Sequence, residues 1–334
     1  MIQTFLATLN PMLMLFICIV VGFLLRKFNL LPENAGKVMA KLELWVFCPA
    51  LSFSAMASRF NVEALGTHLT NVIISSISVC LALVIAINLS KIFVKDKVYE
   101  RGVYQYALAF ANSGYVGDPV VLALFGLEGL VYYKIICLPL SIVIYTWGIS
   151  VLVPKTEQKQ NPLKSILNPP MIAMAIGMIV GITGLGNLIY SSENFFTSTL
   201  SSLSNCMGPI AMLLAGFTIG CYNVKNMLTN KKVYVATFLR LIVIPAVIIG
   251  VLFGLKELAN LALNLNIDNT VLFLLFFAIG APLGLNTVVF PEAYGGDPST
   301  GASMAMISHT LCVITIPLMF ALMTVVFGAP PVFA

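Results

Sequence analysis

The sequence predicts an all-α polytopic membrane protein of ten transmembrane helices, arranged as two inverted five-helix repeats with broken, crossing helices 4 and 9. Its 334 residues are 59% hydrophobic and only 9% charged, with a mean hydropathy of +0.99. One soluble core could not hide so much apolar surface. Apolar stretches of roughly 20 residues, the length that spans a bilayer, also recur between short polar breaks.

Ten such stretches are expected along the chain. They run approximately over Phe5–Leu25, Leu44–Ala57, Val72–Leu89, Tyr104–Phe125, Ile135–Val153, Met171–Leu188, Phe196–Ile219, Tyr234–Leu255, Val271–Phe290 and Ala302–Phe327. No positive residue precedes the first stretch, and Arg26 and Lys27 follow it, so we expect a retained helix and not a cleaved signal peptide.

The positions of Lys and Arg predict the orientation, because these residues accumulate in cytoplasmic loops. On the ten-span arrangement most of the 18 Lys and Arg residues share one face. The other face holds only Arg59, Lys134 and Lys256, and Arg240 falls inside the eighth span. We therefore expect a multi-pass protein of the cell (inner) membrane with both termini external. There is no basic stripe with interleaved aromatic residues that would favour a nucleic-acid partner.

A hydrophilic stretch near the middle, "PKTEQKQNPLKS" at 154–165, separates five spans from five. We expect a first five-helix repeat over 1–153, a cytoplasmic linker over 154–167 and a second repeat over 168–334. The halves open alike, with "LNPMLMLFICIVVG" at 9–22 and "LNPPMIAMAIGMIVG" at 167–181. After five spans the second copy enters the bilayer from the opposite side, which gives the inverted repeat typical of many secondary transporters.

Two spans at equivalent positions of the halves are interrupted. They contain "FANSGYVGDPVV" at 110–121 and "AIGAPLGLNTVVFPEAYGGD" at 278–297. Gly and Pro break a helix, and the freed backbone groups are tolerated at membrane depth only against protein or a watery cavity. A pair of broken helices, with their positive N-terminal ends, predicts a substrate site near the midplane.

These segments also carry a resemblance to a known family. The first fits the pattern N-x-G-x-x-G-x-P through Asn112, Gly114, Gly117 and Pro119, and "LFG" follows. In the second, "APLGLNTVVFPEAYGGD" supplies a matching proline, Pro282. The chain resembles the auxin efflux carrier family, which is related in fold to bile-acid/sodium symporter-like carriers.

The resemblance implies ten helices in two inverted repeats, with the fourth and ninth crossing in a transport domain, and a small organic acid as substrate. Two positions depart from the family. Ala111 stands where plant members often have a proline, and Asp118 occupies a position that is commonly aliphatic. The particular acid and the coupling ion therefore do not follow from the resemblance.

The candidate substrate-binding residues come from both interrupted segments. They are Asn112, Ser113, Gly114, Gly117, Pro282, Leu283, Gly284 and Asn286. An Asn amide can donate to a carboxylate or accept from a cation, but Asn112 could also close the end of a half-helix. Asn286 and Thr287 fit either binding or an N-cap. The glycines would allow close approach of backbone to ligand, or only helix packing.

Three ionisable residues are candidates for coupling or charge: Asp118, Arg240 and His309. Asp118 precedes a proline and could be an N-cap or a proton or sodium site. Arg240 could neutralise an organic anion, pair with Asp118 or extend toward the membrane surface. His309 could carry a proton or pack in the core. Glu43, near the start of the second span, is expected at the interface.

The residue types disfavour an enzyme. With two His, no H-E-x-x-H and no clustered carboxylates, the sequence offers no catalytic metal site, and Ser308 next to His309 does not place a nucleophile against its base. No phosphate-binding loop is present, so we expect a gradient to supply the energy.

We predict a secondary active carrier of a small organic anion, an auxin-like acid or a mono- or dicarboxylate, without a cofactor beyond a coupling H⁺ or Na⁺. The alternative is an ion-coupled channel or a ligand sensor. The expected partners are the anion and the lipid bilayer, with a homodimer as one possible assembly.

Overall fold

The computed structural model describes residues 2–60, 65–152, 167–192, 194–222, 229–263, 267–294 and 299–330. The regular structure in these ranges is helical, apart from one isolated β-bridge. The predicted linker, 154–167, lies outside the described residues except for Leu167.

Seven stretches of the described chain are long and apolar enough to cross a membrane, judged by length and composition. They are Thr8–Lys27, Ala35–Arg59, His68–Phe93, Ser113–Leu152, Phe195–Gly220, Lys231–Ala262 and Ser299–Phe327. Two shorter apolar helices accompany them, Pro169–Ile182 and Thr270–Gly280. The chain is an all-helical polytopic membrane protein, as the composition predicts.

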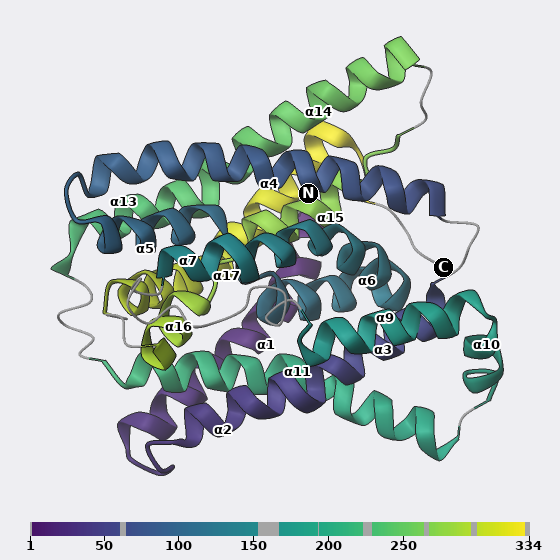
Figure 1. Cartoon of the computed structure of the whole chain (residues 1–334), viewed down its shortest axis with the longest axis horizontal. Coiled ribbons are helices and arrows are strands. Elements are labelled where there is room, and N and C mark those ends of the chain that lie inside the picture. The colour runs from purple at the N-terminus through teal and green to yellow at the C-terminus, as the bar shows by residue number, and fades with distance from the viewer. Residues whose placement is uncertain are drawn as a thin grey trace.

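The helices form two groups that lie side by side (Figure 1). The first, called the α1 group, contains α1 (Ile2–Lys27), α2 (Ala35–Leu42), the π-helical turn η1 (Glu43–Phe47), α3 (Cys48–Arg59), α9 (Pro169–Ile182), α10 (Leu185–Ile189) and α11 (Phe195–Gly220). The second, the α4 group, contains α4 (Leu65–Phe93), α5 (Val98–Ala109), η2 (Ser113–Gly117), α6 (Asp118–Val143), η3 (Ile144–Gly148), α7 (Ile149–Leu152), α13 (Lys231–Phe238), η5 (Leu239–Val243), α14 (Ile244–Leu263), α15 (Thr270–Gly280), α16 (Asn286–Tyr294) and α17 (Ser299–Phe327).

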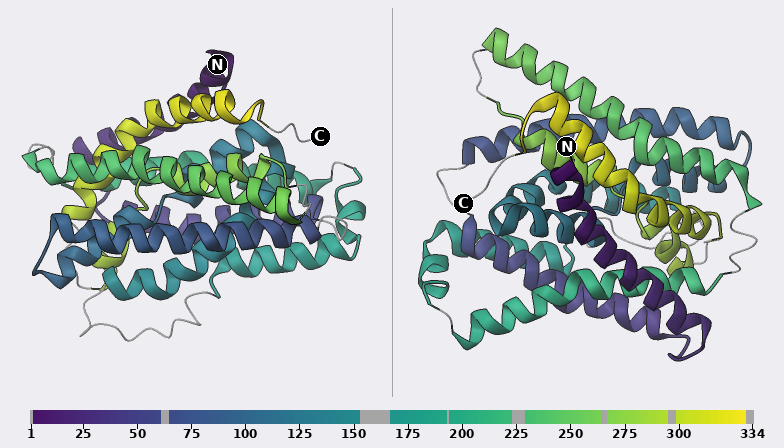
Figure 2. Two further views of the ribbon diagram at one scale, coloured as in Figure 1. Left: turned by 90° about the horizontal axis from the view of Figure 1, so that it is seen from above. Right: turned by 180° about the vertical axis from the view of Figure 1, so that it is seen from behind.

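Glycines let α1 and α11 cross in close contact (Figure 2). A Cβ at Gly22 would overlap the carbonyl of Leu213, and one at Gly216 would overlap the carbonyl of Ile19. Small residues of this kind let two backbones touch where apolar burial gives little driving force. α17 packs against the same helix, α1, and so joins the two groups.

Both interruptions occur where the sequence predicts them. α15 ends at Gly280 because Pro282 follows, and Ala281 before it is extended, with φ −61° and ψ 158°. α5 ends at Ala109 without a proline: Phe110 is extended, with φ −116° and ψ 127°. The next residues, Asn112 and Ser113, are poor helix formers.

The predicted end of the fourth span, Phe125, is confirmed, but the predicted start of the fifth span is wrong. We expected Tyr104–Phe125, an outer loop holding Lys134, and then Ile135–Val153. In the structure α6 joins two helices across a kink at Gly126, whose φ of +66° and ψ of −168° are not helical. Because glycine has no Cβ, it adopts this positive φ, and the second helix begins directly after it without an outer loop. Lys134 therefore lies inside α6.

Candidate functional site

The two interrupted segments meet each other. The N–H of Asn112 donates to the carbonyl of Pro282 at 2.7 Å, and the N–H of Gly284 donates to the carbonyl of Phe110 at 3.3 Å. Ala111 and Leu283 face each other as an antiparallel bridge between these bonds. Backbone groups freed by the two breaks are thus satisfied by one another, as groups remote from bulk water must be.

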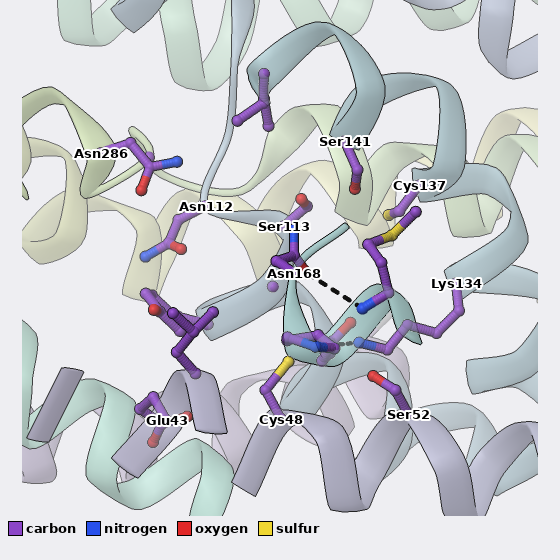
Figure 3. A pocket seen from close by; sticks show the side chains of 18 of the residues that line it. Glu43, Cys48, Ser52, Asn112, Ser113, Lys134, Cys137, Ser141, Asn168 and Asn286 are labelled. Carbon is purple, nitrogen blue, oxygen red and sulfur yellow. Dashed lines mark hydrogen bonds and ion pairs between the residues drawn. The ribbon is translucent and has the colours of Figure 1, made fainter. Parts of the chain in front are cut away.

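A cavity of about 160 Å³ lies beside this contact, between the two helix groups. The α1 group supplies Glu43, Cys48 and Ser52, together with Asn168, Met171 and Met174 of the α9 region. The α4 group supplies both interrupted segments and the α6 residues Lys134, Cys137 and Ser141. Figure 3 shows Asn112 and Asn286 on one side of the cavity, Lys134 and Cys137 on the other, and Glu43, Cys48 and Ser52 below.

The structure brings six of the predicted site residues to this cavity and leaves five outside its lining. Those that line it are Asn112, Ser113, Gly114, Asp118, Gly284 and Asn286. Those that do not are Gly117, Pro282, Leu283, Arg240 and His309. Three of these five residues are still close to residues that line the cavity. Pro282 and Leu283 form the backbone contact, and His309 touches Asn112.

The amide of Asn112 contacts His309 and does not cap a helix. Asn112 occupies the N-cap position of η2, but its side chain makes no cap bond there. Its Nδ2 lies 3.1 Å from Nε2 of His309, and both residues are buried. The backbone carbonyl of Asn112 accepts from Val116 and Gly117 and so starts the new helix.

Asn286 is the first residue of α16, and its side chain reaches across to α5. Its Nδ2 donates to the hydroxyl of Tyr106 at 2.9 Å. Thr287 is buried and donates its hydroxyl to the carbonyl of Gly284 at 2.9 Å. A capping side chain would accept from an N–H, so the expected N-cap role of Thr287 is wrong.

The glycines of the first segment differ in their surroundings. A Cβ at Gly114 would meet nothing within 4 Å, whereas one at Gly117 would overlap the hydroxyl of Tyr133. That hydroxyl donates to the carbonyl of Ser113 at 2.9 Å and cannot easily move away. A Cβ at Gly284 would make ordinary contacts of 3.4 Å or more. Gly114 therefore borders open space, and Gly117 serves packing.

Asp118 forms a buried ion pair with Lys134, which the sequence predicts in an outer loop and not at this site. The side chain of Asp118 is 2% exposed and that of Lys134 is 11% exposed. The N-cap interpretation of Asp118 is wrong, because the helix already begins at Ser113 and Asp118 has helical dihedral angles. Its expected alternative partner, Arg240, is also not the one the structure shows.

Glu43 is a second charged residue whose position in the structure differs from the prediction. We expected it at the membrane interface, but it is 0% exposed and lines the cavity. Neither of its carboxylate oxygens has a hydrogen-bond partner among the described residues. No group of three or more His, Cys, Asp or Glu that could hold a metal ion occurs in the described part of the chain.

Arg240 lies near Leu283, which belongs to the contact between the broken segments. It is 2% exposed, and none of its three guanidinium nitrogens has a partner among the described residues. It borders a second cavity of about 10 Å³ with Thr237, Leu283 and Ser308. It does not extend to the membrane surface, so that interpretation is wrong.

Some signals for the missed residues exist in the sequence. Lys134 interrupts the apolar run "VYYKIICLP", and an ionisable residue within a span is a functional candidate by default. Glu43 follows Lys41 beside a polar segment and cannot be told from an interfacial residue by its position. Tyr106 carries no signal, because its partner Asn286 is 180 residues away.

Comparison with known proteins agrees with this architecture. The profile of the family described as "Membrane transport protein" matches residues 7–320. An uncharacterized transporter of Methanocaldococcus jannaschii is 25% identical over 315 residues, which cover 93% of this chain and 97% of the relative. An uncharacterized transporter of Methanothermobacter thermautotrophicus is 22% identical over 252 residues, covering 75% and 80%. The chain belongs to the membrane transport protein family, which is the auxin efflux carrier-like family that its two interrupted segments resemble.

Proposed function

We propose that this protein is a secondary active transporter that moves a small organic anion across the membrane by alternating access. The observation that carries the proposal is the cavity between the two helix groups. Both interrupted segments form its wall, and the ammonium of Lys134 and the amides of Asn112 and Asn286 border it.

The donors around this cavity suit a carboxylate. The helix that begins at Ser113 and the helix that begins at Asn286 place their N-terminal ends there, where free N–H groups and the helix dipole favour an anion. Lys134 has three N–H donors and uses one for Asp118, so it keeps donors for a ligand. Leu138, Met171 and Met174 add an apolar wall for the body of an auxin-like acid or a mono- or dicarboxylate.

The position of the cavity supports alternating access. It is bounded by the α1 group on one side and the α4 group on the other, so a displacement of one group against the other would change which end of it is open. The hydrogen bonds between the interrupted segments lie within the α4 group. That group can therefore move without breaking them.

The same grouping supports ten crossings in two inverted repeats. In each predicted half the first two spans belong to the α1 group and the other three belong to the α4 group. An internal repeat with the second copy inverted produces this division. The proposal includes insertion in the cell (inner) membrane with both termini external, and a coupling-ion gradient as the energy source.

Counterflow in proteoliposomes tests the proposal. Vesicles preloaded with one unlabelled acid from a panel of acetate, lactate, malate and indole-3-acetate receive the labelled acid outside. We expect transient accumulation that requires acid inside. Flux that is indifferent to the acid inside would show a channel, chemical conversion of the label would show an enzyme, and no flux with any acid would count against the proposal.

Two glycine variants make the test specific to the cavity. Gly114→Leu fills open space in the cavity wall, whereas Gly250→Leu fills open space on the exposed face of α14. We expect the first variant to fold and lose counterflow, and the second to retain both. Equal loss in both variants would mean that the effect does not arise at this cavity.

A further inference from the structure

Glu43 is a buried acid without a counter-charge of its own. It begins the π-helical turn η1, which packs against α2, α3, α9 and α11. Its side chain is 0% exposed, it lines the cavity, and neither carboxylate oxygen has a hydrogen-bond donor among the described residues. A charged carboxylate in such surroundings is costly unless it is paired or neutralised.

The groups that face Glu43 do not supply a free positive charge. α9 and α11 contain no Asp, Glu, Lys, Arg or His. The lysines of α2, Lys37 and Lys41, are exposed, and α3 presents the thiol of Cys48 to the cavity. From α6 come the thiol of Cys137 and the ion pair of Lys134 with Asp118.

The charges around the cavity therefore do not balance when every group is ionised. Lys134 neutralises Asp118, and Glu43 remains as a second carboxylate. An organic anion in the same cavity would add another negative charge. A proton on Glu43 removes both problems, because it neutralises the buried acid and ends its repulsion of the anion.

We propose that Glu43 carries the proton that is coupled to anion transport, while Asp118 and Lys134 stay ionised as a pair. One proton binds a carboxylate oxygen of Glu43 from the side on which the cavity is open, and it leaves to water on the other side after the anion has left. This inference rests on the proposed function for its transport step, but the protonation of Glu43 can be tested without any substrate.

Infrared spectroscopy of the purified protein at neutral pH, in a detergent without ester groups, tests the protonation. We expect a carbonyl band of a protonated carboxyl group that shifts in D₂O. The band should persist in Asp118→Asn and in the control Glu33→Gln, whose glutamate is 88% exposed, and it should be lost in Glu43→Gln. Absence of the band in the wild type, or its persistence in Glu43→Gln, would overturn the proposal. Glu43→Leu provides the same test if Glu43→Gln does not fold.

Transport measurements test the coupling. In proteoliposomes with the acids of the counterflow panel, we expect Glu43→Gln to retain counterflow and to lose accumulation driven by a pH gradient. Accumulation that persists in Glu43→Gln, or that follows a sodium gradient instead of a pH gradient, would overturn the coupling role. Failure of wild-type counterflow with every acid would overturn the proposed function and leave the infrared result to decide the protonation of Glu43.

Discussion

The side-chain nitrogen of Asn112 lies 3.1 Å from Nε2 of His309, and Nδ1 of the same ring lies 2.8 Å from the carbonyl oxygen of Ala305. A carbonyl only accepts, so Nδ1 carries the hydrogen. The Nδ2 of Asn112 only donates, so Nε2 accepts and the ring is neutral. In this arrangement His309 fixes the orientation of an amide that lines the cavity. This contact favours a positioning role for His309 over that of a proton carrier.

Asn112→Ala removes both the amide at the cavity and the donor to His309. We expect this variant to lose counterflow and about 1–3 kcal/mol of stability, because Nε2 is left buried without a partner. Asn112→Asp is the matched variant. It can accept from a protonated His309 and so should fold, yet its negative charge should weaken anion binding. Thermal unfolding and ligand-induced shifts measure both effects, and wild-type affinity in Asn112→Ala would place the site elsewhere.

Two neighbouring glycines should respond oppositely to alanine. At Gly117 a Cβ overlaps the Tyr133 hydroxyl, so we expect Gly117→Ala to lower the stability by about 1–3 kcal/mol. At Gly114 the Cβ meets open space, so the stability of Gly114→Ala should match the wild type. Adding Tyr133→Phe to Gly117→Ala should restore part of the loss in thermal unfolding. No restoration would mean that the overlap is not the cause.

The local chemistry of the two breaks makes them predictable from the sequence. Pro282 cannot continue a helix, and the cluster of Asn, Ser and Gly from Asn112 to Gly114 weakens one. These are properties of a few adjacent residues, and the structure places both interruptions where they predict them. The family resemblance rests on the same residues and is confirmed over most of the chain.

The charged part of the site was not predictable in the same way. Lys134 was placed in a loop between the predicted fourth and fifth spans, but the helix that follows the kink at Gly126 begins earlier than predicted and includes Lys134. Whether Glu43 faces water or the cavity depends on α9 and α11, which are more than 100 residues further along the chain. The partners of Asn112 and Asn286 are 197 and 180 residues away. Such contacts follow from how the helices pack and not from any local pattern.

The ion pair of Asp118 and Lys134 should show strong coupling between its partners. Lys134→Gln leaves the buried carboxylate of Asp118 without a counter-charge, and we expect a loss of about 3–5 kcal/mol. Asp118→Asn should cost less, because the side-chain oxygen of the new asparagine can still accept from Lys134, whose side chain is the more exposed of the two. The double variant should be more stable than Lys134→Gln alone. Additive effects of the two changes in thermal unfolding would show that the residues do not interact.

The orientation of the chain can be tested at the central linker, which lies outside the described residues. Because most Lys and Arg residues share the face of this linker, we expect it to be cytoplasmic. A single cysteine introduced within 154–165 of a cysteine-free variant should react with an impermeant maleimide only after the cells are permeabilised. A second variant with a cysteine added at the N-terminus should react in intact cells. The reverse pattern would invert the proposed orientation.

Arg240 should lower the stability of the folded protein and be required for transport. A guanidinium stays charged in proteins, and this one is 2% exposed with no partner for its three nitrogens among the described residues. Replacing a buried ion pair with apolar side chains is often neutral or stabilising by about 1–4 kcal/mol. Arg240 has no ion pair to lose among the described residues, so we expect Arg240→Met to gain stability within this range. We expect the same variant to lose transport, because Arg240 lies beside Leu283 at the contact of the broken segments. The cavity of about 10 Å³ beside Arg240 has room for one small polar molecule.

Arg59→Met, which removes an exposed arginine at the end of α3, serves as the control and should change neither property. A lower melting temperature in Arg240→Met would show that the guanidinium is stabilised by its surroundings, and full transport activity would show that the buried charge is not part of the mechanism.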